Sequence, residues 1–448
     1  MCKIINYQLY KSSSMKKIIL SLIISILAIV AANVQNTNSG SYQFTLEDCL
    51  EYALDNNYNR QSLKLSEEAS QDTYEQSKKE WLPSLNASLS ESLSNSKGSS
   101  PSWNGNYGVN ASMSLYKGGS IDNTIEQNKL RAQQSAHQSS QYENNLTIQI
   151  LQAFLSVLGS EELLKYQDAV VKTSEEQWKQ GLVQFKAGKI LESDYLLLEA
   201  QWANDKNNIS DTKISRDNSL LVLKGLLSMS PNSDLQIIYP DTSTIVNMSV
   251  LPLLNHVLER TVETLPDIKI SKTNVDIAQI GIKLSEAAYR PTVSLNGSIG
   301  TGHSIDYNNF GTQLSDRLNE QIGLTVSIPI YNNSRTKSKV SQSKIALKQA
   351  ELDKKQTELD VVQNVATEYQ NVVSAYNKFQ TANIRQNAYL KTFEAYSAQF
   401  NAGAITAVDL LQQQNNYISA LNDFIQSKYS FMLKRKILDI YMGEKVTM

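Results

Sequence analysis

Cysteine is scarce in this chain of 448 residues, and its scarcity excludes two kinds of scaffold. Of the two cysteines, Cys2 lies upstream of a predicted export signal, so the mature chain keeps Cys49 alone. A single cysteine forms neither an internal disulfide framework nor a thiolate metal site. A lipid anchor would require cysteine at the predicted cleavage point, where the sequence has Ala32 and Asn33. We therefore expect no disulfide, no thiolate metal site and no lipid anchor.

Histidine and an excess of either charge are also lacking. The three histidines, His137, His256 and His303, are far apart, and we expect them on a long helix, near a helix start and in an outer loop. None has a second ligand at helical spacing, and the chain has no glycine-rich phosphate loop, so we predict no enzyme, no metal site and no cofactor. A net charge of -2 with both signs mixed gives no electrostatic footprint for nucleic acid.

The N-terminus carries the features of an export signal. Lys16 and Lys17 precede the apolar run IILSLIISILAIVAA, which ends in small residues before Asn33. The run is short for a membrane span and polar sequence follows it, as in a secretory signal peptide. We assign residues 1–32 to this signal and to an upstream extension before Met15. The mature chain is therefore predicted to be exported.

Proline is absent from two long stretches. The chain has eight prolines, but none between Pro101 and Pro231 and none after Pro329. Because proline removes a helical hydrogen bond, its absence permits long helices. Both stretches are rich in Gln, Lys, Glu, Ala and Leu, which favour helix, and apolar residues recur at helical spacing from Leu146 to Leu158. We expect a long helical hairpin in each stretch.

One glycine-centred phrase occurs twice, at a fixed offset of 215 residues. FKAGKILESDYL begins at Phe185 and FNAGAITAVDLL begins at Phe400. Gly188 and Gly403 follow the end of each predicted long helix, where a left-handed capping residue is favoured. Each helix would be roughly 100 Å long at about 1.5 Å per residue. Unless such a helix joins a coiled coil or a tube, most of its apolar stripe faces water. Each phrase is thus interpreted as a hairpin tip in an internal two-fold repeat.

Alternating segments predict two strand pairs, at about residues 84–116 and 292–331. Aliphatic side chains from Leu85 to Leu89 alternate with serine and asparagine, and those from Ile322 to Ile330 alternate with small or polar residues. Each run of about ten residues matches a tilted strand that crosses a bilayer, with its apolar side toward lipid. The connecting segments, SNSKGSSPSWNGN and TGHSIDYNNFGTQLSD, are expected to be surface loops. Aromatic residues flank the pairs at matching ends and fit an interfacial girdle: Trp81, Tyr116, Tyr289 and Tyr331.

Four strands are too few to close a membrane barrel, which needs about eight, and an open edge cannot face lipid. If these strands cross a membrane, the chain must form oligomers. Two amphipathic hairpins packed on a soluble core would give the same alternation. Alternation by itself leaves both interpretations open.

The order of these elements resembles the TolC family of outer-membrane efflux and secretion channels (outer membrane efflux proteins), over about residues 44 to 441. The resemblance is carried in the first copy by LEDCLEYALDNN, WLPSL and KAGKI, and in the second by LLNHVLERTVETLPDI, YRPTVSL, VSIPIY and NAGAI. It implies an α+β membrane protein that forms a homotrimer. Each chain would give four strands to a shared 12-stranded β-barrel in the outer membrane of a Gram-negative cell, and its coiled-coil hairpins to a long periplasmic α-helical barrel.

The resemblance also implies a domain layout. The first repeat would span 44–228 and the second 253–441, joined by an equatorial-domain segment at 229–252. The expected parts of the repeats are a long helix, a tip and a return helix, at 117–185, 183–194 and 193–228 in the first and at 333–400, 398–409 and 408–441 in the second.

In this family the tips close the tunnel and receive a periplasmic adaptor attached to an inner-membrane transporter. The positions of this chain that match the adaptor-facing tips are Gly188, Lys189, Ile190, Gly403 and Ala404. Those that match the periplasmic gate are Asp409, Gln412, Asp194, Phe400 and Ile405.

Asp409 matches a pore-lining acidic position, and three copies would form a carboxylate ring that attracts cations. Gln412 replaces a second ring acid, Ile405 replaces an arginine and Phe400 a tyrosine, while Asp194 keeps an acidic partner. We therefore expect a gate held by packing rather than by an ionic lock. As an alternative, Asp409 is an acid in a first helical turn, favoured by the helix dipole.

The expected function is that of a passive exit duct of a tripartite efflux pump or type I secretion system, which exports small molecules or polypeptides. The alternative is a soluble or surface-attached coiled-coil structural protein, with the strand pairs as adhesive tips.

Overall fold

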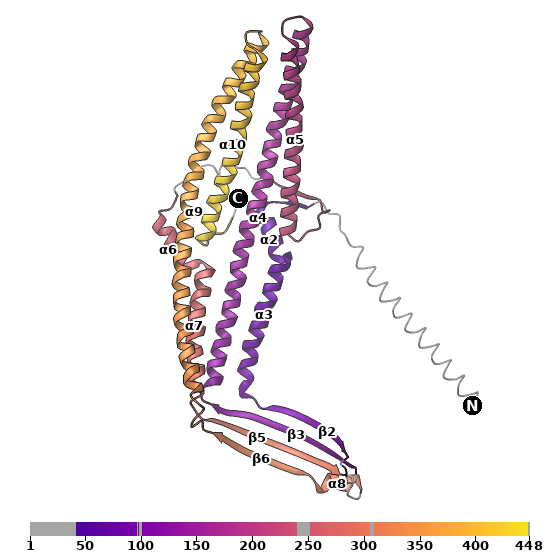
Figure 1. Ribbon diagram of the computed structural model, residues 1–448, viewed down its shortest axis with the longest axis vertical. Helices are drawn as coiled ribbons and strands as arrows, with labels where there is room; N and C mark the ends of the chain where they lie inside the picture. Colours follow the sequence, from indigo (N-terminus) through magenta and orange to yellow (C-terminus); the bar gives the residue numbers. More distant parts are fainter. Residues whose placement is uncertain (1–41, 96, 98–100, 240–250, 305–308, 447–448) are drawn as a thin grey trace, which may run out of the picture.

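A computed structural model of the chain describes residues 42–95, 97, 101–239, 251–304 and 309–446. The predicted signal peptide and its extension, residues 1–32, lie outside the described residues. The molecule is elongated, with a bundle of long helices joined at one end to a four-stranded β-sheet (Figure 1). Both repeats contribute to each part.

The sheet has four antiparallel strands in the order β2–β3–β5–β6. Their bounds are Ser84–Ser94, Ser102–Lys117, Thr292–Ser304 and Asn319–Ser327. The central pair, β3 and β5, comes from different repeats, with Val109 opposite Ile299. The two strand hairpins therefore form one continuous sheet whose edges are β2 and β6.

The two faces of the sheet differ in polarity, as the alternation predicts. Leu85, Val109 and Ile299 lie on one face, because Leu85 pairs with Ala111 and Val109 with Ile299 across the ladder. Serines, asparagines and glycines occupy the opposite face. The aliphatic side chains of the apolar face are exposed in the single chain; Leu89 is 79% and Ile322 is 80% exposed. A surface of this kind is stable only against lipid or another protein.

The predicted loops at the far end of the sheet are shorter than the sequence suggests. β3–β5 pairing continues to Ser304, so His303 lies in a strand and not in an outer loop. In the second connection the helix α8 (Phe310–Asp316) packs against β5, where Thr301 Oγ1 donates to the Leu314 carbonyl at 2.6 Å. β6 ends at Ser327 rather than near Ile330, because Pro329 has no N–H to donate to a ladder.

Two helices of 67 residues each, α4 (Ser120–Lys186) and α9 (Arg335–Asn401), extend along the helical part (Figure 1). α5 (Glu192–Leu226) returns along the distal half of α4, and α10 (Ala407–Tyr441) along that of α9. Each pair forms a hairpin that ends at a glycine tip. Within the described ranges, no helix is both long and apolar enough to span a bilayer.

Two shorter helices, α3 (Tyr58–Lys78) and α7 (Pro266–Ala287), cover the halves of α4 and α9 nearest the sheet (Figure 1). α3 packs on α4 and leads through the 3-10 turn Lys79–Trp81 into β2. α7 packs on both α4 and α9 and so joins the two repeats. Next to the sheet, the four helices pack side by side in the order α3, α4, α7 and α9.

The long helices begin a few residues later than expected. Gly118 and Gly119 precede α4 with φ of +64° and +82°, values that favour glycine. A Cβ on Gly118 would lie 2.5 Å from the Ala287 carbonyl oxygen. Before α9, Asn333 and Ser334 also have positive φ. These left-handed residues turn the chain from the sheet into each helix.

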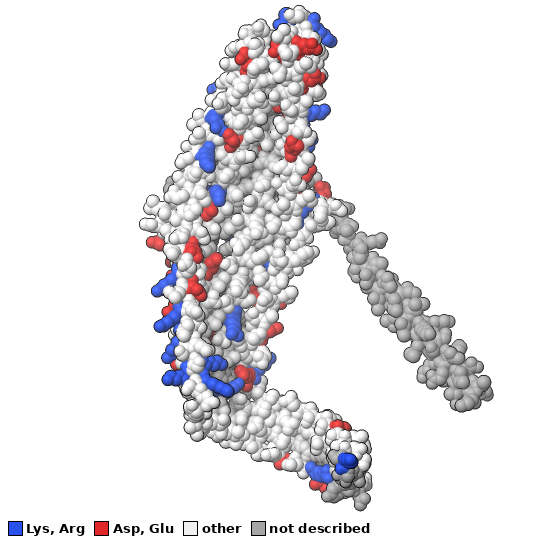
Figure 2. Space-filling model, in the orientation of Figure 1, with Lys and Arg blue, Asp and Glu red and all other residues white. Residues whose placement is uncertain are grey.

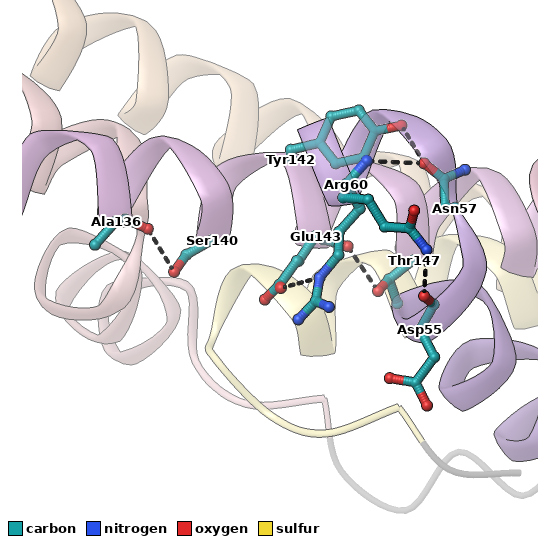
Figure 3. A network of polar contacts seen from close by, with 9 residues as sticks. Asp55, Asn57, Arg60, Ala136, Ser140, Tyr142, Glu143 and Thr147 are labelled. Atoms are coloured by element: carbon teal, nitrogen blue, oxygen red, sulfur yellow. Dashed lines mark hydrogen bonds and ion pairs between the residues drawn. The ribbon is translucent and has the colours of Figure 1, made fainter. Parts of the chain in front are cut away.

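Asn57 joins three helices where α5 ends and α3 begins (Figure 3). Its Oδ1 accepts from the Arg60 N–H and from the Tyr142 hydroxyl, each at 3.0 Å, and its Nδ2 donates to the Leu226 carbonyl at 2.9 Å. Arg60 Nε also pairs with Glu143 at 2.9 Å. These bonds satisfy polar groups at the start of α3 and at the end of α5, so these two helices stack end to end beside α4.

A small domain surrounds the middle of the bundle. It contains β1 (Tyr42–Phe44), which pairs in parallel with β4 (Leu235–Ile237), and the helices α2 (Leu46–Asn56) and α6 (Leu254–Thr264). Of the predicted equatorial segment 229–252, residues 240–250 lie outside the described part. Cys49 of α2 is fully buried in the core, and burial raises the pKa of its thiol to about 12. It is therefore an inert core residue.

Candidate functional site at the helical hairpins

Both hairpin tips end in the same backbone motif. Gly188 has φ +70°, and its N–H donates to the Phe185 carbonyl, while the Lys189 N–H donates to the Gln184 carbonyl, each at 2.9 Å. This pair of bonds is the Schellman motif, which satisfies the last carbonyls of a helix. Gly403, Ala404, Phe400 and Gln399 repeat the same two bonds in the second tip.

The tips present small exposed surfaces. Gly188, Lys189, Gly403 and Ala404 are exposed, and Ile190 is half-buried. A Cβ placed on either glycine would meet no atom within 4 Å. The glycines are therefore required by backbone conformation, and the space beside them is open.

The return helices begin differently in the two repeats. In α10, Thr406 and Asp409 form a capping box, with the Thr406 hydroxyl donating to Asp409 Oδ2 at 2.7 Å and accepting from the Asp409 N–H at 3.3 Å. In α5, Leu191 is at the capping position, without a side-chain bond, and Asp194 is at the position of Asp409. Asp409 thus caps its own helix while its side chain remains exposed.

Of the other predicted gate residues, two share one apolar cluster and two lie apart from it. Phe400 is 1% exposed and packs with Leu198 and Leu410 in the core of the distal bundle, and Ile405 packs against the same cluster. Gln412 is exposed, and its amide donates to Asn416 one turn later at 3.4 Å. The structure brings together Phe400 and Ile405 but leaves Asp194 on the other hairpin.

A buried polar contact joins the two hairpins below the tips. Gln414 of α10 donates to Asp205 Oδ2 of α5 at 3.0 Å, and the two residues are 1% and 3% exposed. Gln201 donates to the other carboxylate oxygen at 2.9 Å. Burial raises the pKa of Asp205, although hydrogen bonds from Ser174 and Gln201 oppose this shift.

A second polar contact joins α4 to α10 nearer the middle of the bundle. Lys428 Nζ lies 2.8 Å from Glu162 Oε2, and the Tyr429 hydroxyl donates to the same oxygen at 2.6 Å. Burial, followed by the bond to Glu162, raises the pKa of Tyr429, so the phenol remains a donor. The two contacts hold the α9–α10 hairpin against α4 and α5.

The packing between the hairpins is imperfect. Among the described residues, both amide atoms of Gln177, Gln414 Oε1 and Trp178 Nε1 are buried without a hydrogen-bond partner. Each such group costs about 1–3 kcal/mol. A groove of about 740 Å³ between α4, α5 and α10 adjoins this region, and its lining includes Asp205.

The four predicted girdle aromatics lie at one end of the sheet. Trp81 and Tyr289 come just before β2 and β5, while Tyr116 is at the end of β3 and Tyr331 follows β6. Because neighbouring strands are antiparallel, all four positions fall at the end of the sheet that joins the helices. Tyr331 is 80% exposed, and Trp81 is half-buried.

Several residues of the hairpin interface had no signal in the sequence. Asp205, Gln414, Glu162 and Lys428 are polar residues within long polar helices, and no motif marks them. In the part of the chain that the structure describes, no group of three or more acidic, histidine or cysteine residues is arranged to hold a metal ion.

Comparison with known proteins gives a family-model match over residues 49–228 and 257–444, for the family described as "Outer membrane efflux protein". The "Outer membrane protein TolC" of Vibrio cholerae serotype O1 is 20% identical over 353 residues, which are 76% of this chain and 80% of that protein. The "Outer membrane efflux protein BepC" of Brucella suis is 35% identical over 79 residues, 18% of this chain and 16% of that protein.

Solved structures share the fold. A structure of CusC has a TM-score of 0.78 at 16% identity, covering 89% of this chain and 92% of that one. The outer-membrane channel OprN has a TM-score of 0.76 at 15% identity, covering 89% and 90%. The open state of the Neisseria gonorrhoeae MtrE outer membrane channel has a TM-score of 0.73 at 19% identity, covering 89% and 88%.

Proposed function

Because the chain belongs to the outer membrane efflux protein family, we propose that it is the outer-membrane exit duct of a tripartite efflux pump or type I secretion system. Its sheet lies in the outer membrane and its helices extend into the periplasm. The duct is passive, and its energy comes from an inner-membrane transporter that a periplasmic adaptor connects to the tips. Cargo is a small molecule or a polypeptide.

One observation carries this proposal: an amphipathic sheet with two unpaired edges continues directly into helices of 67 residues. The edge strands β2 and β6 need partners in lipid. Three copies supply 12 strands, enough to close a barrel in which β2 of one chain pairs with β6 of the next. The polar face then lines a wet lumen.

The helices supply a matching seam. On α9 the side chains of Ile345, Leu352 and Leu359 recur every seven residues and are 55%, 64% and 49% exposed. Leu65 of α3 is also 65% exposed, on the other flank of the helical layer. A seven-residue apolar stripe is the signature of a helix that packs against a partner helix. These flanks support contact of α9 with α3 of a neighbouring subunit.

The gate is proposed at the distal hairpins. Opening would move the α9–α10 hairpin away from α4 and α5, and this movement would break the Asp205–Gln414 and Glu162–Lys428 contacts. Exposed Asp409 and Gln412 would line the pore, with Phe400, Ile405 and Asp194 supporting the tips. Gly188, Lys189, Ile190, Gly403 and Ala404 would meet the adaptor.

Membrane fractionation and conductance together test the proposed function. The full chain, expressed with its export signal, is expected in outer membranes after washing with urea, and the purified protein is expected to form steady channels in planar bilayers. A chain that urea releases, and that gives no conductance, would instead be a surface-attached structural protein.

A further inference from the structure

A basic groove lies between the C-terminal end of α7 and the start of α9. It has a volume of about 600 Å³, and its charged lining consists of Arg290, Lys337 and Lys344 against the single carboxylate of Glu286. Arg290 Nη1 is held by a bond to the Gly118 carbonyl at 3.2 Å. No described carboxylate lies within 4 Å of the Lys337 or Lys344 ammonium, so both lysines are available to an anion.

The groove lies at the level where the apolar sheet ends. Tyr289 forms part of its lining and lies three residues before the first residue of β5. Ile330, beyond the end of β6, is 94% exposed, and Tyr331 follows it. Aromatic residues at such an edge sit at the depth of lipid headgroups. If the sheet spans the outer membrane as proposed, the three cations lie at the depth of the headgroups of the periplasmic leaflet.

The positive charge is specific to the second repeat. Residues 335–348 contain five basic residues and no acidic residue, whereas the corresponding stretch of α4, residues 120–133, contains Asp122, Glu126, Lys129 and Arg131. Figure 2 shows Lys and Arg gathered over the part of α9 next to the sheet. Because the first repeat lacks this excess of basic residues, the repeated architecture does not explain it.

The lysines lie beside the protein contacts of α9 and not within them. Thr336 and Val340 are buried, and Ser343 bonds Ser285 of α7 at 2.7 Å, so these positions mark the side toward α7. Ile345 marks the opposite flank, the proposed subunit seam. At 100° per residue, Lys337 and Lys344 lie between these two sides. Neither the contact with α7 nor the proposed seam covers them.

We propose that this groove binds the phosphate of an anionic phospholipid headgroup in the periplasmic leaflet of the outer membrane. Arg290, Lys337 and Lys344 contact the phosphate oxygens, and Tyr289 packs where the headgroup meets the acyl chains. The inference rests on the proposed function, because it requires the sheet to lie in a membrane. Lysine and arginine donate charge-assisted hydrogen bonds to phosphate oxygens. Basic clusters next to a membrane also attract anionic lipid.

The test compares lipid selectivity in two charge-matched variants. Wild type, Lys337→Gln/Lys344→Gln, and the control Lys129→Gln/Arg131→Gln are purified in detergent and mixed with equal amounts of phosphatidylglycerol and phosphatidylcholine. Bound lipid is then counted by native mass spectrometry. The control removes two positive charges at the corresponding height of α4. We expect wild type and control to retain phosphatidylglycerol preferentially, and the α9 variant to lose this preference by roughly tenfold.

Equal retention of the two lipids by wild type, or equal loss in both variants, would overturn the lipid site. Release of phosphatidylglycerol by excess inorganic phosphate alone would indicate a site for a free anion, and would also contradict the proposal. The same spectra report the number of subunits. A trimer without lipid preference refutes this inference only, whereas a monomer refutes the proposed function.

Discussion

Asp205 is the residue at which burial and charge compete most clearly within the proposed gate. Its carboxylate is 3% exposed, and its hydrogen bonds come from uncharged donors, Gln201 and Gln414 among them. Amide donors compensate a buried charge less fully than a cation does. The contact therefore positions α5 against α10 through uncharged donors alone.

Replacing the Asp205 carboxylate should change how the stability of the fold depends on pH. Because burial raises the pKa of Asp205, the folded state binds this proton more tightly than the unfolded state does. Its contribution to stability is greatest at acidic pH and falls as pH rises from the ordinary value of 3.8 through the raised pKa. Asp205→Asn removes the titrating group and should therefore flatten this decline of stability between acidic and neutral pH.

Thermal unfolding at pH 4 to 8 measures this effect. Asp211→Asn on the exposed face of the same helix makes the same charge change and should leave the profile near that of wild type. A steeper loss of stability with pH in Asp205→Asn than in wild type would contradict the assigned role of burial.

Residues of this kind also mark the limit of what the sequence predicts. Gly188 and Gly403 could be placed at turns because one residue type satisfies a positive φ. Asp205 and Gln414 meet only because of the angular positions of two helices that are 209 residues apart. Asp409 was expected to be either a ring acid or a first-turn acid; the structure contains the helix cap, and the ring remains a proposal.

At the scale of elements, the two hairpins are joined by an apolar cluster and by polar contacts of α10 with α4 and α5. The packing within each hairpin is continuous along 35 residues of return helix, whereas Glu162 with Lys428 and Tyr429 is one of the polar links between hairpins. Weakening a link between hairpins should favour opening, while weakening a contact inside one hairpin should not.

Lys428→Met tests this distinction. The change keeps the side-chain length but leaves Glu162 without its cation, which weakens the contact between α4 and α10 by about 1–3 kcal/mol. The open population should rise roughly tenfold, because 1.4 kcal/mol corresponds to a factor of ten. Single-channel recording in planar bilayers would show it as more frequent or larger openings.

Lys434→Met is the matched control. Lys434 pairs with Glu368 at 3.1 Å, and this ion pair joins α10 to α9 within one hairpin. Its loss should leave conductance unchanged. If Lys434→Met opened the channel as much as Lys428→Met, the hairpins would not move as units.

The sequence predicted the elements better than their ends. The 3.6-residue periodicity and the missing prolines indicated both long helices, and two-residue alternation indicated the strands. The loop predicted around His303 was wrong, because strand pairing with β3 continues through polar positions up to Ser304. Cross-strand hydrogen bonds decide where a strand ends, and side-chain polarity does not report them.

At the scale of the whole molecule, the fold is that of the outer membrane efflux proteins, as the doubled order of motifs predicted. A single chain leaves two strand edges and an apolar sheet face uncovered. Lipid can cover the face but cannot satisfy the edges. The requirement for oligomers was therefore visible in the sequence, while the trimer came from the resemblance.

The number of subunits in the outer-membrane complex tests this account most directly. Native mass spectrometry of the full mature chain, extracted from outer membranes in mild detergent, should give three copies of one polypeptide, which supply 12 strands from four each. A stable monomer, whose β2 and β6 edges pair with nothing outside the chain, would contradict the barrel and with it the exit duct.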